Sequence, residues 1–484
     1  MKSKQIVIVG AGVGGLGTAL RLAHRGHSVT VLEKNNFVGG RNHREQVGGC
    51  HFDAGPTLLM MLDPFRKLFA DVGESFDKHL DIRLCDPTYR VFFSDGIQID
   101  ATTDIEKMAK RISDLSGPAP AAAYPQFLKE LKQLYDESIP HFVRKNFRSL
   151  ADFASPPQLG RVVRNHMLGN LAKRVHKKFE DPKLRMLFTF QSMYLGLSPH
   201  DAPWVYATLA YMEYGEGIWY PMGGLPAISE AIARLAEERG AKIRLNCNVK
   251  SIDEKSVTLQ GGEVINADIV IANADMPYAQ RELTAAPPKR SLRYSCSAHL
   301  MYLDYNGELP GMEHHNVFFG NDFDGNLDSL FHKVAMPSDP AFYACISKKT
   351  EPSMAPNGHS NLMLLVPVPN LDCPPTKEAT QKLEQEVFAR LTKEVGFNPS
   401  KIRGIKRRGP TEWQQELNLE KGAAFGISHD LFQSAFMRPQ NRSLTQPNLF
   451  FVGASTVPGN GLPMVLISAE LVEQRLVQEG LIPA

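Results

Sequence analysis

A strand, a glycine-rich turn, a helix and a second strand within the first 34 residues constrain the fold of this chain more than any other feature. Residues 6–12 read IVIVGAG, a β-branched apolar run that stops at glycine, as buried parallel strands do. The following GTALRLAHRG has apolar residues at helical spacing, and HSVTVLEK is typical of a second strand. The chain therefore opens with a βαβ unit, which predicts an α/β fold with a Rossmann-like domain.

The turn between the first strand and the helix has the pattern GxGxxG. Glycines at this spacing allow a tight turn, the close approach of a pyrophosphate to the backbone, and packing of the helix on the strand. Glu33 ends the second strand, where a carboxylate accepts hydrogen bonds from ribose hydroxyls and repels a 2′-phosphate. The pattern favours FAD or NAD over NADP, and these residues are candidate cofactor contacts: Gly10, Gly12, Gly14, Gly15, Glu33 and Lys34.

The next stretch, NNFVGGRNHREQVGGCHFDAGPTLL, separates FAD from NAD. An NAD domain usually continues into another helix, whereas Gly40 and Arg41 here form a second close-approach turn whose arginine can hold a flavin phosphate or a ribityl oxygen. Gly55, Pro56 and Thr57 follow a short strand and read as a further turn at the cofactor. The alternative is a plain surface turn with a solvated arginine. We predict that the cofactor is FAD.

The chain also ends on a strand, a glycine-rich loop and a helix, VGASTVPGNGLPMVLISAELVEQRL, at residues 452–476. This unit can enclose the same cofactor from the other side, because a helix N-terminus favours negative charge such as that of a reduced flavin. The alternative is an ordinary helix cap at the end of a domain. The candidate contacts are Gly453, Ala454 and Ser455 near the phosphate and ribityl chain, and Gly461, Leu462, Pro463 and Met464 near the isoalloxazine.

The middle of the chain predicts two further regions. Apolar residues at spacings of three and four dominate from about residue 60 to 215, whereas strand and helix patterns mix from about 290 to 405. The expected domains are a discontinuous FAD-binding domain (1–75, 218–288 and 408–484), a helical lobe that contacts substrate and membrane (76–217), and a substrate-binding domain with a mixed sheet (289–407).

A basic amphipathic segment lies within the expected helical lobe. Within residues 161–188, the part up to residue 178 interleaves six Lys and Arg with Val, Leu and Met, which suits either an anionic membrane surface or a solvated helix face. The six basic residues are Arg161, Arg164, Lys173, Arg174, Lys177 and Lys178.

Composition excludes several classes of protein. The net charge of +2 gives no global signal for nucleic acid, and the six dispersed cysteines indicate neither a disulfide framework nor a zinc site. His314 and His315 are adjacent, so on a strand they are expected to point in different directions, and we predict no metal. The glycines near the N-terminus argue against a signal peptide, and no apolar run is long enough to span a bilayer. We therefore expect a cytoplasmic protein, with attachment to a membrane surface left open.

Taken in order, the motifs above resemble those of the bacterial-type phytoene desaturase family of FAD-dependent carotenoid oxidoreductases. The resemblance covers nearly the whole length and is most specific in four blocks: EYGEGIWYPMGGLPAISEAIARLAEERGA, KTEPSMAPNGHSNLMLLVPVPNL, SAFMRPQNRS and NLFFVGASTVPGNGLPMVLISAEL. It implies a peripheral membrane enzyme that removes hydrogen from a long linear polyisoprenoid and passes electrons to an external acceptor such as oxygen or a quinone. It also implies that Val249 meets the adenine through its backbone.

The sequence departs from this family at Val457, where a histidine commonly precedes the proline, and at Met464. Both positions are expected near the flavin ring or the substrate tunnel, which leaves three other groups of functions open. These are a carotenoid oxygenase, isomerase or saturase; an amine- or porphyrinogen-oxidase-like enzyme; and a flavin-binding protein without turnover. No single carboxylate among the 52 acidic residues can be chosen as a catalytic base from the sequence.

Overall fold

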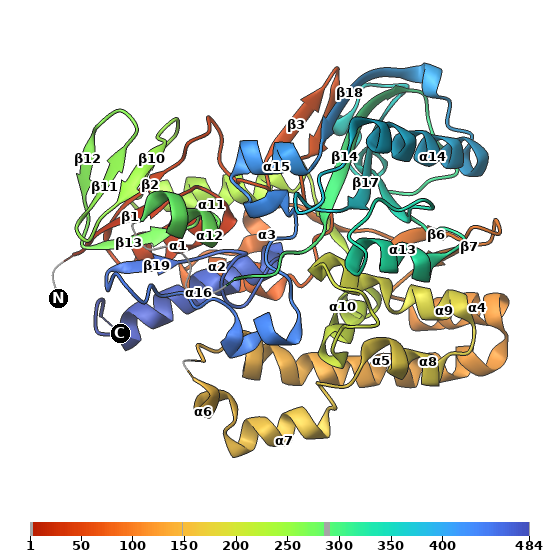
Figure 1. Cartoon of the computed structure of the whole chain (residues 1–484), viewed down its shortest axis with the longest axis horizontal. Helices are drawn as coiled ribbons and strands as arrows, with labels where there is room; N and C mark the ends of the chain where they lie inside the picture. Colours follow the sequence, from red (N-terminus) through yellow and green to blue (C-terminus); the bar gives the residue numbers. More distant parts are fainter. Residues whose placement is uncertain (1–2, 148, 285–290, 484) are drawn as a thin grey trace.

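The computed structural model describes residues 3–147, 149–284 and 291–483. Lys2, part of the signal-like N-terminus, and the predicted domain limit at 288/289 lie outside the described residues. Figure 1 shows three regions: a parallel sheet with its helices, a second sheet beside it, and a layer of helices below both.

The first region is a five-stranded parallel sheet in the order β19-β13-β1-β2-β9. Its strands are short, and β1 and β13 at its centre are rich in β-branched residues and almost fully buried, as parallel strands covered on both faces require. They come from three distant segments of the chain: β1 (Gln5–Val9), β2 (Ser28–Leu32), β9 (Lys242–Arg244), β13 (Ile269–Ala272) and β19 (Leu449–Phe451).

Helices from both ends of the chain pack together on one face of this sheet. α1 packs between α16 and α11, and α2 lies against α16. Their bounds are α1 (Val13–His24), α2 (Asp63–Asp71), α11 (Pro226–Glu238) and α16 (Leu462–Gln478). A three-stranded antiparallel sheet, β10 (Val249–Ile252), β11 (Ser256–Leu259) and β12 (Val264–Asn266), and the short helix α12 (Met276–Tyr278) pack beside the opposite face.

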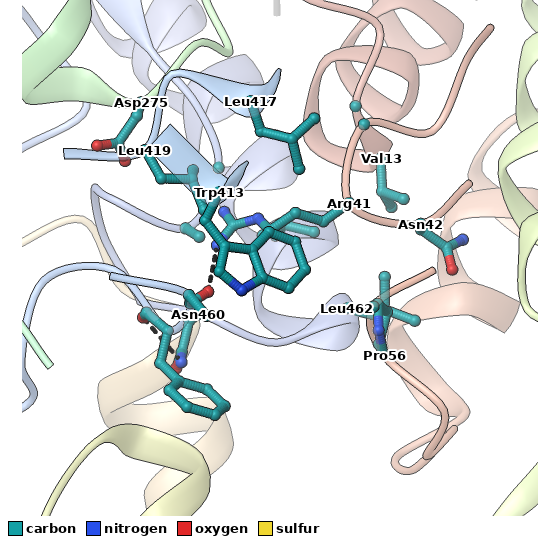
Figure 2. Close-up of a pocket in the computed structure, with 18 of the residues that line it drawn as sticks. Val13, Arg41, Asn42, Pro56, Asp275, Trp413, Leu417, Leu419, Asn460 and Leu462 are labelled. Atoms are coloured by element: carbon teal, nitrogen blue, oxygen red, sulfur yellow. Dashed lines mark hydrogen bonds between the residues drawn. The ribbon is translucent and has the colours of Figure 1, made fainter. Parts of the chain in front are cut away.

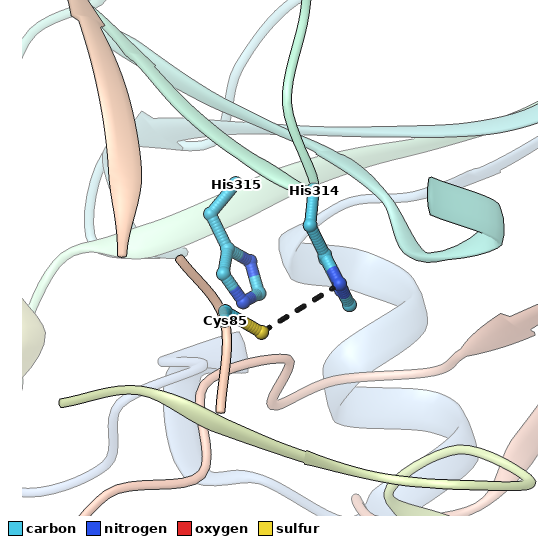
Figure 3. A group of neighbouring side chains, drawn as sticks. All are labelled: Cys85, His314 and His315. Atoms are coloured by element: carbon cyan, nitrogen blue, oxygen red, sulfur yellow. Dashed lines mark hydrogen bonds between the residues drawn. The ribbon is translucent and has the colours of Figure 1, made fainter. Parts of the chain in front are cut away.

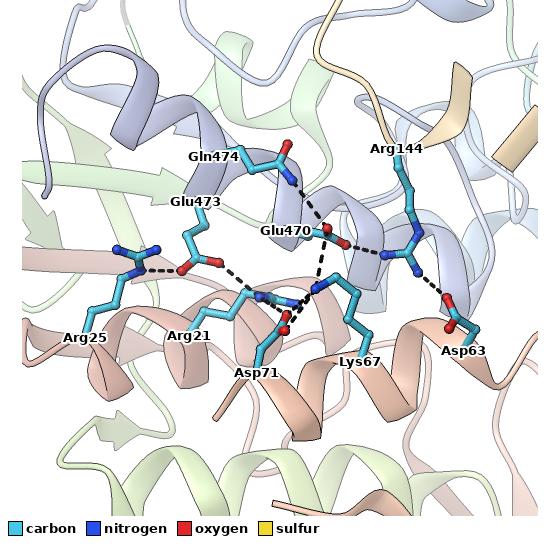
Figure 4. Close-up of polar contacts among 9 residues, drawn as sticks. All are labelled: Arg21, Arg25, Asp63, Lys67, Asp71, Arg144, Glu470, Glu473 and Gln474. Carbon is cyan, nitrogen blue, oxygen red and sulfur yellow. Dashed lines mark hydrogen bonds and ion pairs between the residues drawn. The ribbon is translucent and has the colours of Figure 1, made fainter. Parts of the chain in front are cut away.

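An ion-pair network fixes the C-terminal helix α16 against the N-terminal helix α1 (Figure 4). Arg21 of α1 is 5% exposed and its Nη1 lies 2.8 Å from Asp71 and 3.0 Å from Glu473. Arg144 similarly joins Glu470 of α16 at 2.7 Å. Buried pairs are costly to break because one charge is then left uncompensated. The network therefore holds α1 and α16, from opposite ends of the chain, in one orientation.

The second region is a seven-stranded mixed sheet in the order β18-β14-β17-β16-β15-β6-β7, in which only β15 and β6 run parallel. Its strands are β6 (Tyr89–Phe92), β7 (Gln98–Ala101), β14 (Ser297–Asn306), β15 (His315–Phe318), β16 (Phe342–Ile346), β17 (His359–Val368) and β18 (Ile402–Arg408). The helices of this region are α13 (Phe323–Phe331), α14 (Lys377–Val395) and α15 (Pro410–Leu417).

Two small antiparallel pairs, β3–β4 and β5–β8, complete the strands of the described residues. Their bounds are β3 (Arg44–Val47), β4 (Cys50–Asp53), β5 (Ile82–Leu84) and β8 (Trp219–Pro221), and the short helix α3 (Phe76–His79) precedes β5.

The third region is a lobe of helices with its own aromatic core. Its main members are α4 (Ile105–Ser116), α5 (Pro118–Ser138), α6 (Leu150–Phe153), α7 (Pro156–Arg164), α8 (Leu171–Lys178), α9 (Pro182–Leu187) and α10 (Thr208–Tyr211). Short 3-10 and π-helical turns connect them, among them η1 (Ile139–Val143), η2 (Phe190–Leu195) and η4 (Met212–Glu216). None of the described helices combines the length and the apolar character that crossing a bilayer requires.

One part of the expected helical lobe is not helical. Residues 82–101 hold β5, β6 and β7, and the last two form one edge of the mixed sheet. Strand β6 (Tyr89–Phe92) pairs in parallel with β15. This is a long-range contact, which no local sequence pattern indicates. The helices of the lobe therefore begin at α4; the other domain limits stay predictions.

Candidate functional site

A single cavity of about 440 Å³ runs between the parallel sheet and the mixed sheet. Its walls come from both ends of the chain and from the middle, and Figure 2 shows Arg41, Trp413, Asn460 and Leu462 facing it. We call the part beside the parallel sheet the dinucleotide end, and the part beside the mixed sheet the apolar end.

The N-terminus of α1 lies at the dinucleotide end. Gly12 is its N-cap and supplies no side-chain hydrogen bond, so the first backbone N–H groups of the helix face the cavity without a cap. A Cβ on Gly14 would lie 2.8 Å from Asn273 Oδ1 and 3.3 Å from the Cα of Gly453. The two glycine loops and Asn273 thus form a cradle that side chains would fill, as a bound pyrophosphate requires.

Glu33 is held in place by three N–H donors. The Ala11 backbone N–H donates to Oε2 at 2.8 Å, and the backbone and side-chain N–H groups of Asn35 donate to Oε1 at 2.9 Å each. The side chain is 5% exposed and lines the cavity beside Lys34 and Val249. A ribose that hydrogen-bonds to this carboxylate meets a fixed acceptor.

Arg41 and Asp275 both line the cavity, and each influences the pKa of the other. Burial lowers the pKa of Arg41, against the attraction of Asp275, and burial raises the pKa of Asp275, against the attraction of Arg41. Arg41 Nη1 donates to the Ala424 carbonyl at 3.1 Å. A buried cation at a glycine cradle suits a phosphate, which would supply the negative charge that this guanidinium lacks.

The N-terminus of α16 lies on the other side of the cavity. Its N-cap is Gly461, at φ +102°, and again no side chain caps the helix. The loop before it is braced by Arg438, 1% exposed, which donates to the carbonyls of Ala454 at 2.8 Å and Thr456 at 2.9 Å. Two uncapped helix ends therefore point at one cavity, and both favour an anion.

Sixteen of the nineteen predicted contacts line the cavity: Gly10, Gly12, Gly14, Glu33, Lys34, Gly40, Arg41, Gly55, Pro56, Thr57, Val249, Gly453, Ala454, Ser455, Gly461 and Leu462. Gly15, Pro463 and Met464 do not. A Cβ on Gly15 would lie 2.2 Å from the Gly10 carbonyl oxygen, so this glycine is required by helix packing. That these sixteen residues contact FAD stays a prediction.

The positions where the sequence departs from the family pattern lie beside the cavity, not in its lining. Val457 is 7% exposed and belongs to an apolar cluster with Ile467 and Leu471 of α16, against which Met464 packs. Both side chains therefore pack beside the cavity and do not line it; that they lie near the flavin ring or the substrate tunnel stays a prediction.

Sequence analysis missed several lining residues. Asn273 and Asp275 end a buried strand in VIANAD, and polar residues at a strand end were the available signal. The others carried no local signal because they reach the cavity only through tertiary packing: Tyr278, Trp413, Leu417, Leu419, Phe425 and Asn460.

The apolar end is formed mainly by one face of the mixed sheet. The lining residues from strands are Ala298, Leu300, Val317, Phe342, Tyr343, Leu365 and Pro367, and those from neighbouring segments include Leu58, Met60, Phe190, Met193 and Phe319. Charged side chains are absent from this group, so the surface suits a hydrocarbon.

The main polar feature here is a chain of hydroxyls leading to buried histidines. The Thr57 and Tyr343 hydroxyls are 2.8 Å apart, and Tyr343 lies 2.6 Å from Nδ1 of His315. The His314 and His315 rings lie close together, with centroids 4.0 Å apart and planes tilted by 32°, next to Cys85 (Figure 3). The expectation that the two imidazoles point in different directions is wrong, because His314 precedes strand β15 and is not held by its alternation.

These three residues bring one ligand-type atom each within 4.8 Å of one another, so they could hold a metal. Burial lowers the pKa of His314 to about 3 and that of His315 well below its ordinary value, so both imidazoles are neutral. Their Nδ1 atoms already bond to the hydroxyls of Thr350 and Tyr343. The absence of a metal stays a prediction.

A buried carboxyl lies behind the apolar end. Glu213 is fully buried, and its Oε2 accepts hydrogen bonds from Gln191 at 2.9 Å and Tyr89 at 3.2 Å, whereas Oε1 has no partner of regular geometry among the described residues. Burial raises its pKa to about 7, against hydrogen bonding by Gln191, Tyr194 and Tyr89. Tyr194 is itself part of the cavity wall.

Comparisons with known proteins agree with this geometry. A model of the flavin containing amine oxidoreductases matches residues 13–472. The chain is 41% identical to a zeta-carotene-forming phytoene desaturase of Myxococcus xanthus, over 98% of this chain and 94% of that protein. It is 30% identical to a 4,4'-diapophytoene desaturase of Staphylococcus haemolyticus, over 98% and 99%.

Among solved structures, cyclohexylamine oxidase from Brevibacterium oxydans aligns over 99% of this chain and 100% of its own, with a TM-score of 0.61 and 17% identity. At that identity the likeness concerns the fold alone. The cradle, the buried arginine and the two uncapped helices fit a flavin dinucleotide, and the cofactor is FAD.

Proposed function

Since the chain belongs to the phytoene desaturases, within the flavin containing amine oxidoreductase family, we propose that it uses FAD to remove hydrogen from a long linear polyisoprenoid during carotenoid biosynthesis. The reaction extends a conjugated polyene. The higher identity to the phytoene desaturase than to the diapophytoene desaturase, 41% against 30%, favours phytoene as the substrate.

The observation that carries this proposal is one cavity with two chemically different ends. The dinucleotide end offers backbone donors, an arginine and a carboxylate, and the apolar end offers the hydrocarbon face of a sheet. Leu462 and Val465, at the start of α16, line the cavity between them. A flavin ring placed there meets an apolar chain directly.

FAD, when bound, accepts a hydride and so performs the redox step. The glycine loops, Glu33 and Arg41 would hold its dinucleotide portion. The apolar lining excludes water, and it positions an unfunctionalised chain through contact area, since such a chain has no polar group to bind. The protein thus supplies position and a dry site for a carbon that becomes cationic as it loses hydride.

Co-expression tests the substrate and the reaction together. We expect that cells making phytoene, but lacking their own desaturase, accumulate longer conjugated polyenes when they express this chain. Parallel cells making the thirty-carbon analogue should respond less. Absorbance and mass distinguish desaturation from oxygenation, isomerisation and saturation, and unchanged substrate in both strains would contradict the proposal.

We further propose that the protein attaches peripherally to a membrane, from which such a substrate must come. Exposed apolar side chains gather on α7 and the turn after it, with Val163 72% and Leu168 58% exposed. Both line a depression that also contains Lys173, Arg174 and Lys177. Apolar side chains beside cations suit the interface of an anionic bilayer.

The basic segment is only partly available for such a surface. Lys178 pairs with Glu130, Arg161 with Glu137, and Arg174 lies over the Trp204 ring at 4.7 Å. Lys173 and Lys177 are exposed. Charge reversal at Lys178 would therefore break a structural ion pair as well.

Vesicle flotation tests the surface. The double substitution Val163→Asn and Leu168→Asn should weaken binding to vesicles that contain anionic lipid, and Lys173→Glu with Lys177→Glu should do so only at low salt. Val264→Asn, at a position 58% exposed on β12, is the matched control. Equal flotation of all four proteins would contradict this surface.

The proposed electron acceptor is oxygen or a quinone dissolved in the same membrane. The sequence has one GxGxxG pattern and no second one for a nicotinamide cofactor. Anaerobic turnover should therefore stop after one reduction of the flavin and resume on addition of a soluble quinone. Anaerobic turnover sustained by NADP alone would contradict the proposal.

A further inference from the structure

Thr57, Tyr343 and His315 form a continuous hydrogen-bonded chain from the cavity into the protein. The two hydroxyl oxygens are 2.8 Å apart, and the Tyr343 oxygen lies 2.6 Å from His315 Nδ1. Thr57 and Tyr343 line the cavity, whereas His315 is 0% exposed. The hydrogen-bonded chain therefore starts at the cavity and ends at a fully buried side chain.

This chain begins where the two ends of the cavity meet. Pro56 and Leu462, the first residue of α16, both line the cavity, and Thr57 follows Pro56 directly. Tyr343 comes from β16, next to Phe342 in the apolar wall. A carbon that gives hydride to the flavin ring would therefore have its neighbouring carbon close to these hydroxyls.

Removal of two hydrogens from adjacent carbons leaves one proton to place. One C–H bond breaks with its electron pair, which passes as hydride to the oxidised flavin. The second C–H bond leaves its pair behind as the new π bond, and its proton needs an acceptor. The charged lining residues Glu33, Lys34, Arg41 and Asp275 lie at the dinucleotide end. Acceptors for the apolar end must come from hydroxyls.

Two tyrosines of the lining are candidates, Tyr194 and Tyr343. Tyr194 lies near Glu213, but Oε1 of that carboxyl has no partner with regular hydrogen-bond geometry among the described residues. Tyr343 has regular partners on both sides, one in the cavity and one buried. Among the described residues, Tyr343 is thus the tyrosine of the apolar end that joins the cavity to a buried acceptor through hydrogen bonds of regular geometry.

We propose that Tyr343 and His315 form the proton acceptor of the desaturation, with Thr57 donating a hydrogen bond that orients the Tyr343 hydroxyl: the proton from the substrate carbon passes to the Tyr343 oxygen as the Tyr343 hydroxyl proton moves to His315 Nδ1. This inference rests on the proposed function. When a quinone reoxidises the flavin it takes up two electrons and two protons, so the proton held by His315 is released in that half-reaction.

The burial of the histidines suits a transient acceptor. Desolvation lowers the pKa of His315, and neighbouring His314 lowers it further, so the imidazole is neutral and ready to accept. A C–H bond next to a polyene cation is strongly acidic, so a weak base suffices to remove its proton. The same burial disfavours the charged imidazolium, so His315 loses its proton and is neutral again before the next turnover.

Tyr343→Phe tests the relay by removing one hydroxyl. With the purified holoenzyme and substrate in vesicles, we expect turnover to fall about 100-fold, within the usual range for general acid–base catalysis, at unchanged FAD content. Thr57→Val should lower turnover about 10-fold, since only the outer member is lost. Tyr305→Phe is the control in the same sheet: this tyrosine is buried, and its hydroxyl accepts a hydrogen bond from the Asn398 backbone N–H, away from the cavity lining.

Position-specific deuterium distinguishes a relay from a structural role. In Tyr343→Phe the isotope effect at the proton-losing carbon should rise while that at the hydride-losing carbon falls, because proton removal becomes rate-limiting. A merely loosened site would lower both rates without changing this balance. Wild-type turnover and isotope effects in Tyr343→Phe, or their loss in Tyr194→Phe instead, would overturn the relay. Failure of the wild-type protein to make any polyene would instead contradict the proposed function.

Discussion

The two ends of the cavity treat buried polar groups in opposite ways. At the dinucleotide end, Glu33 receives three N–H donors and two helices direct uncapped N–H groups at the same space. Behind the apolar end, Glu213 receives two donors on one oxygen, and His315 Nε2 has no partner among the described residues. The first end stabilises charge, and the second holds its titratable groups neutral.

This difference indicates that one end can bind the anionic cofactor and the other can support proton transfer at the substrate. Oriented backbone donors bind a permanent anion at little reorganisation cost. A region poor in donors destabilises lasting charge but tolerates proton transfer between neutral groups. The cofactor's phosphates and the substrate's hydrocarbon therefore need the two environments that the cavity combines.

The largest expected effect comes from deforming the glycine loop at the dinucleotide end. In Gly15→Ala the new Cβ would lie 2.2 Å from the Gly10 carbonyl oxygen, and the backbone cannot yield without moving the glycine loop. We expect a protein purified without flavin absorbance. Gly160→Ala is the control, since this helical glycine of α7 has no atom within 4 Å of the added Cβ. Normal flavin content in Gly15→Ala would show that the loop adapts.

The next effect concerns the buried carboxyl behind the apolar end. The folded protein holds the Glu213 proton up to about pH 7, whereas the unfolded chain loses it near its ordinary pKa of 4.5. The folded state therefore binds more protons between these values, and this residue's contribution to stability falls as pH rises through that window. Above about pH 7, the ionised Glu213 lowers the free energy of unfolding by about 3 kcal/mol.

Glu213→Gln removes the charge and should remove this penalty. The difference in unfolding free energy between the variant and the wild type should increase by about 2 to 3 kcal/mol, in favour of the variant, from pH 5 to pH 8. Denaturant unfolding of both holoproteins at the two pH values measures the gain. If the difference in unfolding free energy between variant and wild type is the same at both pH values, Glu213 is ionised in the folded protein and the two ends of the cavity are electrostatically alike.

The smallest effect comes from narrowing the apolar end. Val317 is 7% exposed and lines the cavity from β15, so Val317→Phe should lower turnover about tenfold and leave FAD affinity unchanged. Products with fewer added double bonds should also accumulate. Val264→Phe, at an exposed position of β12, controls for the added ring. Lost FAD binding in Val317→Phe would mean that the two ends are not separable.

Much of the dinucleotide end could be predicted because its chemistry is local. Glycines at fixed spacing, a strand end and a helix start lie within a few residues of each other, and FAD and the α/β fold were correctly inferred from them. Gly15, Pro463 and Met464 belong to the same motifs yet lie outside the cavity lining. A motif identifies a turn, but it does not tell which of its side chains face inward.

The apolar end could not be predicted in the same way. Thr57 and Tyr343 are 286 residues apart, and β6 joins β15 across more than 200 residues of intervening chain. The His314 and His315 side chains were expected to point in different directions, and instead their rings lie 4.0 Å apart. Apolar and hydroxyl side chains are common in any core, so their individual positions carry no signal.

The sequence alone determined the cofactor class, the βαβ unit and the return of the C-terminal segment to the same cavity, because backbone conformation at glycines and strand ends is set by neighbouring residues. Only the tertiary structure decided which side chains face the substrate, which acids and histidines are desolvated, and how a hydroxyl chain reaches a buried imidazole. Burial and proximity are long-range properties, and pairing of distant strands creates them after the local motifs have formed.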